Sequence, residues 1–174
     1  MLHAGDGRTV IEGSAFSSQD EFNVTYRRKS LYVIDSSGII EHVIPVSSGE
    51  YASVRGEASR LGCLTSLHEG QYLLPGFIDL HVHAPQWAQN GAALDEPLER
   101  WLDKYTFPTE SRFSDRRYAD KVHGHLVDAL LSRGTTTVLY FDTIYRDSAI
   151  GLARICAEKG QRAFVGKVVM DDPD

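Results

Sequence analysis

Two histidines, His81 and His83, stand one residue apart at the end of the apolar run LLPGFIDLHVHAPQW, which covers residues 73–87. Residues i and i+2 of a β-strand point to the same face. If the run is a strand, the two imidazoles project side by side, close enough to share one metal ion. Neutral imidazole is a common zinc ligand, and bound zinc lowers the pKa of water towards about 7. The alternative is that both histidines are polar residues that close a buried strand.

A second pair with the same spacing, His123 and His125, provides an internal comparison. These two residues lie in a segment whose apolar periodicity predicts a helix over 114–134. In a helix, residues i and i+2 point about 200° apart, so they cannot bind a common ion. We therefore predict that both are surface residues.

From residue 73 onward, strand and helix patterns alternate. Strands are predicted at 73–82, 135–141 and 162–170, and helices at 96–105, 114–134 and 147–160. Ser114 and Asp147 are the expected N-caps of the last two helices, and Gly134 and Gly160 their expected ends. This order predicts a parallel sheet with crossover helices, whose first strand is buried on both faces. His81 and His83 then lie at the carboxyl end of a parallel strand, where active sites assemble.

The first 72 residues have a different pattern, with short β-branched and aromatic runs separated by Gly, Ser and Asp. This composition predicts short strands joined by turns. The sequence DSSG at 35–38 is typical of a hairpin turn, and residues 49–62 are expected to hold a short helix. The chain is therefore expected to have a β-rich domain at 1–72 and an α/β domain at 73–174.

Composition excludes several classes of protein. The 174 residues are 42% hydrophobic and carry a formal net charge of -6, which gives no support to nucleic-acid binding. No run approaches the roughly 18 apolar residues of a membrane span, and no secretory signal is expected at the N-terminus. The two cysteines, Cys63 and Cys156, do not form a disulfide framework. We expect a cytosolic protein without nucleic-acid or membrane partners.

The Pro-Gly pair, the apolar run, Asp79 and the paired histidines together resemble the first barrel strand of the amidohydrolase superfamily. That resemblance implies a (β/α)8 TIM-type barrel, and a small β-sandwich built from both ends of the chain. Residues 1–72 would be the N-terminal part of the sandwich. Residues 73–174 would be the first three strands, with their helices, of an incomplete barrel.

Four further segments narrow the resemblance: HVHAPQW, LDEPLERWLDKYTFPTESRF, RGTTTVLYFDTI and KGQRAFVGKVVMD. Together they resemble the guanine deaminases within that superfamily, which implies hydrolytic deamination of guanine to xanthine and ammonia. A related purine, pterin or triazine aminohydrolase is the alternative, because it shares the histidine pair but not WLDKYTFPTE. Zinc deaminases of the cytidine type are excluded, because the chain lacks their H-x-E…P-C-x-x-C pattern.

The resemblance also implies roles for single residues. His81 and His83 match two ligands of the one zinc ion that each complete active site holds, and Gln86 matches a glutamine that hydrogen-bonds the purine. A carboxamide presents both a donor and an acceptor, which suits the edge of guanine. Trp87 lies beside Gln86 and is taken as a second substrate contact. By residue type alone, Gln86 would be a solvent-facing loop residue.

Several other residues near this strand have more than one possible role. Asp79 is expected either to support a ligand or to cap neighbouring backbone amides. Asp142 follows the second barrel strand and is expected to be solvated or to contact a ligand. The aromatic residues Trp101, Tyr105 and Phe107 are expected to pack the long segment over the barrel mouth.

The resemblance also identifies what this sequence does not contain. The superfamily takes further ligands from strands five, six and eight, and a glutamate after the strand-five histidine transfers the proton. A complete barrel needs roughly 200 residues or more, so no catalytic base is expected in this chain. It is interpreted as a truncated enzyme, inactive alone, or as a non-catalytic short form or interaction module. The complete enzyme is expected to be a homodimer with guanine as its substrate.

Overall fold

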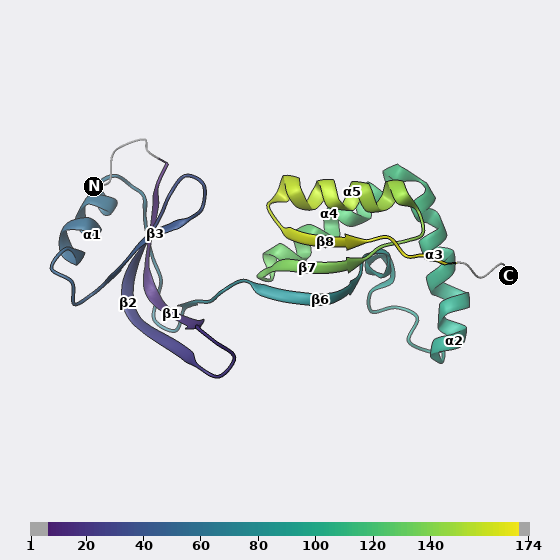
Figure 1. Cartoon of the computed structure of the whole chain (residues 1–174), viewed down its shortest axis with the longest axis horizontal. Coiled ribbons are helices and arrows are strands. Elements are labelled where there is room, and N and C mark those ends of the chain that lie inside the picture. Colours follow the sequence, from purple (N-terminus) through teal and green to yellow (C-terminus); the bar gives the residue numbers. More distant parts are fainter. Residues whose placement is uncertain (1–6, 171–174) are drawn as a thin grey trace. The chain divides into compact units, whose positions relative to one another are not determined.

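The computed structural model describes residues 7–170 and divides the chain into two compact units, Met1–Pro75 and Gly76–Asp174 (Figure 1). The predicted domains also include residues 1–6 and 171–174, which lie outside the described part. Within the described part, no helix is both long and apolar enough to cross a lipid bilayer.

The first unit is built on one mixed sheet of five strands. Its elements are β1 (Thr9–Ser18), β2 (Val24–Ile34), β3 (Ile40–Pro45), α1 (Tyr51–Arg60), β4 (Leu64–Ser66) and β5 (Tyr72–Leu73). The order is β3-β2-β1-β4, and β5 also pairs with β1. The β1–β2 and β2–β3 pairs are antiparallel, whereas β4 and β5 run parallel to β1. The predicted strands and the predicted short helix are therefore confirmed.

The predicted hairpin turn at 35–38 joins β2 to β3. The carboxylate of Asp35 accepts hydrogen bonds from the backbone N–H groups of Ser37 and Ile39. Gly38 has a φ of +88°, a conformation that glycine adopts without strain. The turn therefore forms for the reason that its sequence indicates.

A buried carboxylate ties α1 to the sheet. Glu12, in β1, is 2% exposed and accepts hydrogen bonds from Tyr51, Arg55 and Ser66. The ammonium of Lys29 lies 3.3 Å from the same carboxylate. Burial alone would raise the pKa of Glu12, but the hydrogen bonds from these four residues outweigh it and lower the pKa to about 2. The charged form of Glu12 therefore holds four elements together.

The second unit contains a three-stranded parallel sheet. Its elements are β6 (Phe77–His83), the 3₁₀ helix η1 (Ala84–Gln89), α2 (Leu98–Trp101), the π-helical turn η2 (Leu102–Thr106), α3 (Phe107–Ser111), the 3₁₀ turn η3 (Arg112–Ser114), α4 (Arg116–Ser132), β7 (Thr135–Phe141), α5 (Arg146–Lys159) and β8 (Arg162–Gly166). The strands run in the order β6-β7-β8, and both neighbouring pairs are parallel. Figure 1 shows α4 and α5 on the same face of this sheet. The predicted strand–helix alternation is confirmed.

Some predicted boundaries were wrong. The N-cap of α4 is Asp115, whose carboxylate accepts from the backbone N–H of Arg117, whereas the Ser114 hydroxyl donates to Ser111. The helix predicted at 96–105 continues through η2 and α3, and β8 ends at Gly166. Asp147 lies in the first turn of α5 and does not cap it. Gly134 and Gly160 follow α4 and α5 with positive φ angles, as predicted.

The core of the second unit lies between the sheet and its two helices. Its buried members are Ala84, Leu126, Val127, Val138, Tyr140, Leu152, Ile155 and Cys156. Ala163 and Val165 of β8 and Val82 of β6 pack against this cluster. One face of the sheet is therefore covered by helices.

The prediction that β6 is buried on both faces was wrong for this chain. Phe77, Ile78 and Leu80 are 56%, 66% and 65% exposed. The strand lies at the edge of its sheet, and among residues 7–170 it pairs only with β7. Gly76, which precedes it, is required by close packing, because a Cβ there would lie 1.9 Å from the Thr136 hydroxyl oxygen. The apolar sequence of β6 suits more neighbours than the described chain provides.

Candidate metal-binding site

The imidazoles of His81 and His83 meet at the carboxyl end of β6. Strand alternation places them on one face, and their Nε2 atoms lie 3.2 Å apart. Both residues are exposed to solvent. The structure therefore brings together the two residues that the sequence singled out as ligands.

A phenylalanine from the neighbouring strand lies against both rings. The Phe141 ring centroid is 4.7 Å from that of His81 and 5.2 Å from that of His83, and it stacks on the latter at 21°. Phe141 is the last residue of β7 and pairs in register with His83. Phe141 was not among the site residues predicted from the sequence, although parallel strands that end together would have placed it here. It limits where the imidazoles can move.

The surroundings of His83 favour its neutral imidazole. Partial burial, and then the neighbouring His81, lower the pKa of His83. Neutral imidazole is the form that binds metal. The carboxylate of Asp79 accepts a hydrogen bond from the backbone N–H of His81 at 3.1 Å, which is the capping role expected as one alternative. Asp79 therefore fixes the backbone of the strand at the first imidazole.

The spacing of the two nitrogens fits a shared zinc ion. Two nitrogens bound to one tetrahedral zinc lie about 3.3 Å apart, close to the separation seen between His81 and His83. No cluster of three or more His, Cys, Asp or Glu residues suited to a metal occurs among residues 7–170. A catalytic zinc uses about three protein ligands. The described residues therefore provide an incomplete ligand set.

The predicted substrate residues lie on η1, directly after His83. Ala84 and Pro85 are buried at its start, and Trp87 packs against the core of the second unit. At its end, the Gln89 amide donates a hydrogen bond of 2.9 Å to the buried hydroxyl of Thr106. Gln86 is half-buried between these anchors. Its position three residues beyond His83 is therefore held from both ends of the helix.

The prediction that His123 lies on the surface was wrong. His123 is fully buried in α4, and its Nε2 lies 3.2 Å from a carboxylate oxygen of Asp142, which is 1% exposed. The buried residues of α4 are Ala119, His123, Leu126 and Val127, a helical stripe that includes the histidine. A solvated Asp142 is likewise excluded, whereas His125 is exposed as predicted. The position of His123 on this stripe was the signal that would have identified it as buried.

The three aromatic residues predicted to cover the barrel mouth lie in the long segment between η1 and α4. Trp101 and Tyr105 are half-buried, and Phe107 is 42% exposed. The Tyr105 hydroxyl donates to the carboxylate of Asp95. These residues belong to the continuous helical segment formed by α2, η2 and α3.

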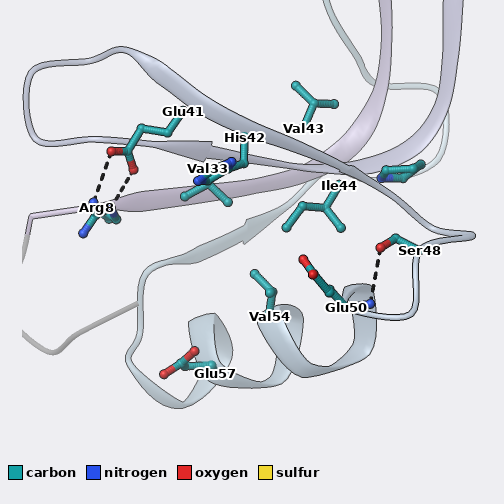
Figure 2. Close-up of a pocket in the computed structure, with 11 residues that line it drawn as sticks. Arg8, Val33, Glu41, His42, Val43, Ile44, Ser48, Glu50, Val54 and Glu57 are labelled. Carbon is teal, nitrogen blue, oxygen red and sulfur yellow. Dashed lines mark hydrogen bonds and ion pairs between the residues drawn. The ribbon is translucent and has the colours of Figure 1, made fainter. Parts of the chain in front are cut away.

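The first unit has a pocket of about 420 Å³ between α1 and β3 (Figure 2). Three glutamates, Glu41, Glu50 and Glu57, line it together with apolar side chains, and the Arg8 guanidinium pairs with the Glu41 carboxylate at 2.7 Å. The Arg8 guanidinium already occupies the Glu41 carboxylate, and no group of three or more His, Cys, Asp or Glu residues suited to a metal occurs here among residues 7–170. The pair on β6 is therefore the better-supported candidate site.

Comparison with known proteins gives a consistent assignment. Residues 72–174 match the model of the amidohydrolase family. Over 98% of its length the chain is 36% identical to guanine deaminase of Dictyostelium discoideum, of which it spans 40%. Over 62% of its length it is 49% identical to guanine deaminase of Mus musculus, of which it spans 24%. The chain therefore covers less than half of the length of these relatives.

Solved structures of guanine deaminases agree with this assignment. A crystal structure of guanine deaminase from C. acetobutylicum with guanine bound in the active site matches 96% of this chain, with a TM-score of 0.78 and 30% identity. The E. coli guanine deaminase matches 95% of the chain, with a TM-score of 0.75 and 26% identity. The chain spans 38% and 37% of these two structures. By its fold, its sequence and the family match over residues 72–174, this chain belongs to the amidohydrolase family.

Proposed function

We propose that this chain forms the first part of a zinc-dependent guanine deaminase, which hydrolyses guanine to xanthine and ammonia. The observation that carries the proposal is the 3.2 Å approach of the His81 and His83 nitrogens at the carboxyl end of a parallel strand. In parallel α/β folds, active sites assemble at that end. The guanine deaminases that match the chain give the substrate.

Each residue near the pair has a proposed task. His81 and His83 hold the zinc ion, and the Phe141 ring and the Asp79 carboxylate keep the imidazoles and their backbone in place. The chemistry that zinc supplies is acidification of water, which gives a nucleophile near neutral pH. Gln86 offers the edge of guanine a hydrogen-bond donor and an acceptor, and Trp87 is a second contact for the substrate. Both residues are anchored through η1, which favours a fixed orientation.

The remaining ligands and the proton-transferring base would come from the part of the relatives that this chain does not span. The open edges of β6 and β8 and the exposed side chains of β6 support completion of the sheet into a (β/α)8 barrel. The single mixed sheet of the first unit would likewise be one layer of a small sandwich. We propose that the complete enzyme is a homodimer, as the family resemblance implies, and that it is cytosolic, as the composition of the chain predicts.

A non-catalytic short form is the second candidate. It is favoured by the incomplete ligand set, because residues 7–170 supply two convergent imidazoles and no third ligand. Measurement of the size of the endogenous protein separates the two candidates. A polypeptide of the length of the relatives supports the enzyme, and one of 174 residues supports the short form.

The substrate assignment has its own test. In a chimaera, this chain replaces the matching part of the D. discoideum guanine deaminase, to which it is 36% identical. The chimaera is loaded with zinc and assayed with guanine, adenine, a pterin and an aminotriazine. We expect release of ammonia from guanine at the highest catalytic efficiency. A folded, zinc-loaded chimaera that prefers another of these compounds would contradict guanine as the substrate.

A further inference from the structure

We propose that His123 and Asp142 form a buried positioning pair, which fixes the end of β7 and, through Phe141, the two imidazoles of the metal pair. The inference extends the proposed function, since it concerns how the proposed ligands are held. Neither residue touches the imidazoles in the described contacts. We therefore expect the pair to affect His81 and His83 indirectly, through the position of Phe141.

The pair is enclosed and only partly satisfied. His123 and Asp142 are 0% and 1% exposed, and one contact of 3.2 Å joins them. The second nitrogen of His123 and the second carboxylate oxygen of Asp142 are buried without a hydrogen-bond partner among the described residues. Burial of polar atoms without partners costs free energy. Joining α4 to β7 through this pair therefore costs free energy of folding.

Packing does not require this pair. Leu126 and Val127 already hold α4 in the apolar core with Val138 and Tyr140 of β7. Replacing a buried polar or ionic pair by apolar residues of similar volume is often neutral or stabilising. Stability alone therefore does not explain why a histidine and an aspartate occupy these positions.

The pair acts on the residue next to Asp142. Phe141 precedes it directly, and the Phe141 ring contacts His81 and His83 at centroid distances of 4.7 and 5.2 Å. The backbone N–H of Asp142 donates to Gly166 at 2.9 Å, so the backbone and the side chain of Asp142 are both fixed. With Asp142 held on both sides, the backbone that carries the Phe141 ring has little freedom to turn.

The surroundings leave His123 as the partner that holds the Asp142 side chain. Burial, and then the charge of Asp142, raise the pKa of Glu110 in α3, so a second carboxyl group lies within electrostatic range of Asp142. The Phe113 ring covers His123 at a centroid distance of 5.3 Å. Loss of His123 would leave the Asp142 carboxylate without a side-chain hydrogen-bond donor among residues 7–170, within electrostatic range of a second carboxyl group. We expect the end of β7 to shift in that case.

The experiment uses the full 174-residue chain and four variants: Asp142→Ala, Asp142→Asn, the double variant His123→Phe with Asp142→Ala, and His125→Ala. The last is a matched control, because His125 is exposed on the same helix. Three quantities are measured: the melting temperature, the apparent zinc affinity, and the ring NMR signals of ¹³C-labelled His81 and His83. The NMR signals report the position of the Phe141 ring without metal.

A positioning pair predicts a specific pattern. Asp142→Ala shifts the His81 and His83 signals and weakens zinc binding about tenfold or more, the usual effect of losing support behind a ligand. Asp142→Asn retains both properties, because the amide still reaches His123. The double variant has the melting temperature of the unsubstituted chain, but its ring signals and its zinc affinity stay changed, as in Asp142→Ala. His125→Ala changes none of the three.

Two results would overturn the inference. Unchanged ring signals in Asp142→Ala would show that Phe141 is held without the pair. Recovery of ring signals and zinc affinity together with stability in the double variant would show a packing role only. Zinc binding that is too weak to measure in the unsubstituted chain is compatible with the proposed function, which is tested separately in the chimaera. The ring signals then still decide the positioning role, so the two failures are distinguishable.

Discussion

The Nε2 atoms of His81 and His83 lie 3.2 Å apart at the carboxyl end of β6, under the ring of Phe141. Strand alternation places the two imidazoles on one face of β6, and the Phe141 ring contacts both of them. The pair is thus suited to contribute two ligands to a site completed by other segments.

The role of Gln86 is tested by its replacement with alanine in the chimaera. We expect discrimination of guanine to fall by about 1–3 kcal/mol, the cost of leaving a buried polar partner unpaired. Zinc content should not change, since η1 stays anchored by Pro85 and Gln89. The measurement is the catalytic efficiency for guanine together with bound zinc. An unaltered efficiency would show that Gln86 does not contact the purine.

The anchor of η1 gives a second prediction. Thr106→Val removes the hydroxyl that accepts from Gln89, which leaves a buried amide donor unpaired. Since η1 carries Gln86, we expect KM for guanine to rise several-fold in the chimaera while zinc content is retained. Thr106→Ser keeps a hydroxyl and serves as the control. Equal KM values in Thr106→Val and Thr106→Ser would show that the hydrogen bond between Gln89 and Thr106 does not affect the binding of guanine.

Glu12 predicts how stability depends on pH. Its pKa is lowered from 4.5 to about 2 in the folded chain, so folding favours the charged form. The associated stability, on the order of 3 kcal/mol, is present above pH 4.5 and is lost as the pH falls towards 2. Denaturant unfolding between these pH values should show this loss.

Two variants check this assignment. Glu12→Gln should be less stable at neutral pH and should show a flatter pH dependence, because it cannot carry the charge. Glu69→Gln changes an exposed residue and should retain the slope of the unsubstituted chain. A Glu12→Gln curve parallel to that of the unsubstituted chain would place the acid-sensitive group elsewhere.

The 174-residue chain alone is predicted to be inactive and difficult to keep in solution. The sheet of the second unit has two open edges, and Phe77, Ile78 and Leu80 are largely exposed, which favours aggregation or pairing. Zinc binding should be weak because two imidazoles are too few for a catalytic site. Light scattering and conversion of guanine to xanthine by the purified chain test this. Turnover that disappears in His83→Ala would show that a second copy or other residues complete the site.

Local patterns predicted most of the secondary structure. The i, i+2 spacing of the histidines and the glycines after α4 and α5 report on the backbone of one element, so the sequence alone was sufficient. The position of His123 was missed because its spacing from His125 was considered and its spacing from Ala119 and Leu126 was not. Phe141 and the Glu12 network were missed for a different reason. Their contacts join strands and helices far apart in the chain, which no local pattern contains.

The burial of β6 shows a second limit of sequence interpretation. A continuous apolar run predicts a strand with neighbours on both faces, and it reports the environment for which the strand is suited. In the described chain those neighbours are largely missing, so Ile78 and Leu80 are exposed. This mismatch supports the proposal that further segments extend the sheet into a barrel.

Bound zinc and turnover, measured on the same preparation of the chimaera, test the assignment of His81 and His83 most directly. The unsubstituted chimaera, His81→Ala and His83→Ala are compared, with His125→Ala as a control for loss of an exposed histidine. If both histidines are zinc ligands, the unsubstituted protein and His125→Ala bind about one zinc per chain and convert guanine to xanthine, which is the result that the assignment predicts. It predicts loss of both zinc and turnover in the other two variants. Full zinc content and turnover in folded His81→Ala and His83→Ala would contradict it.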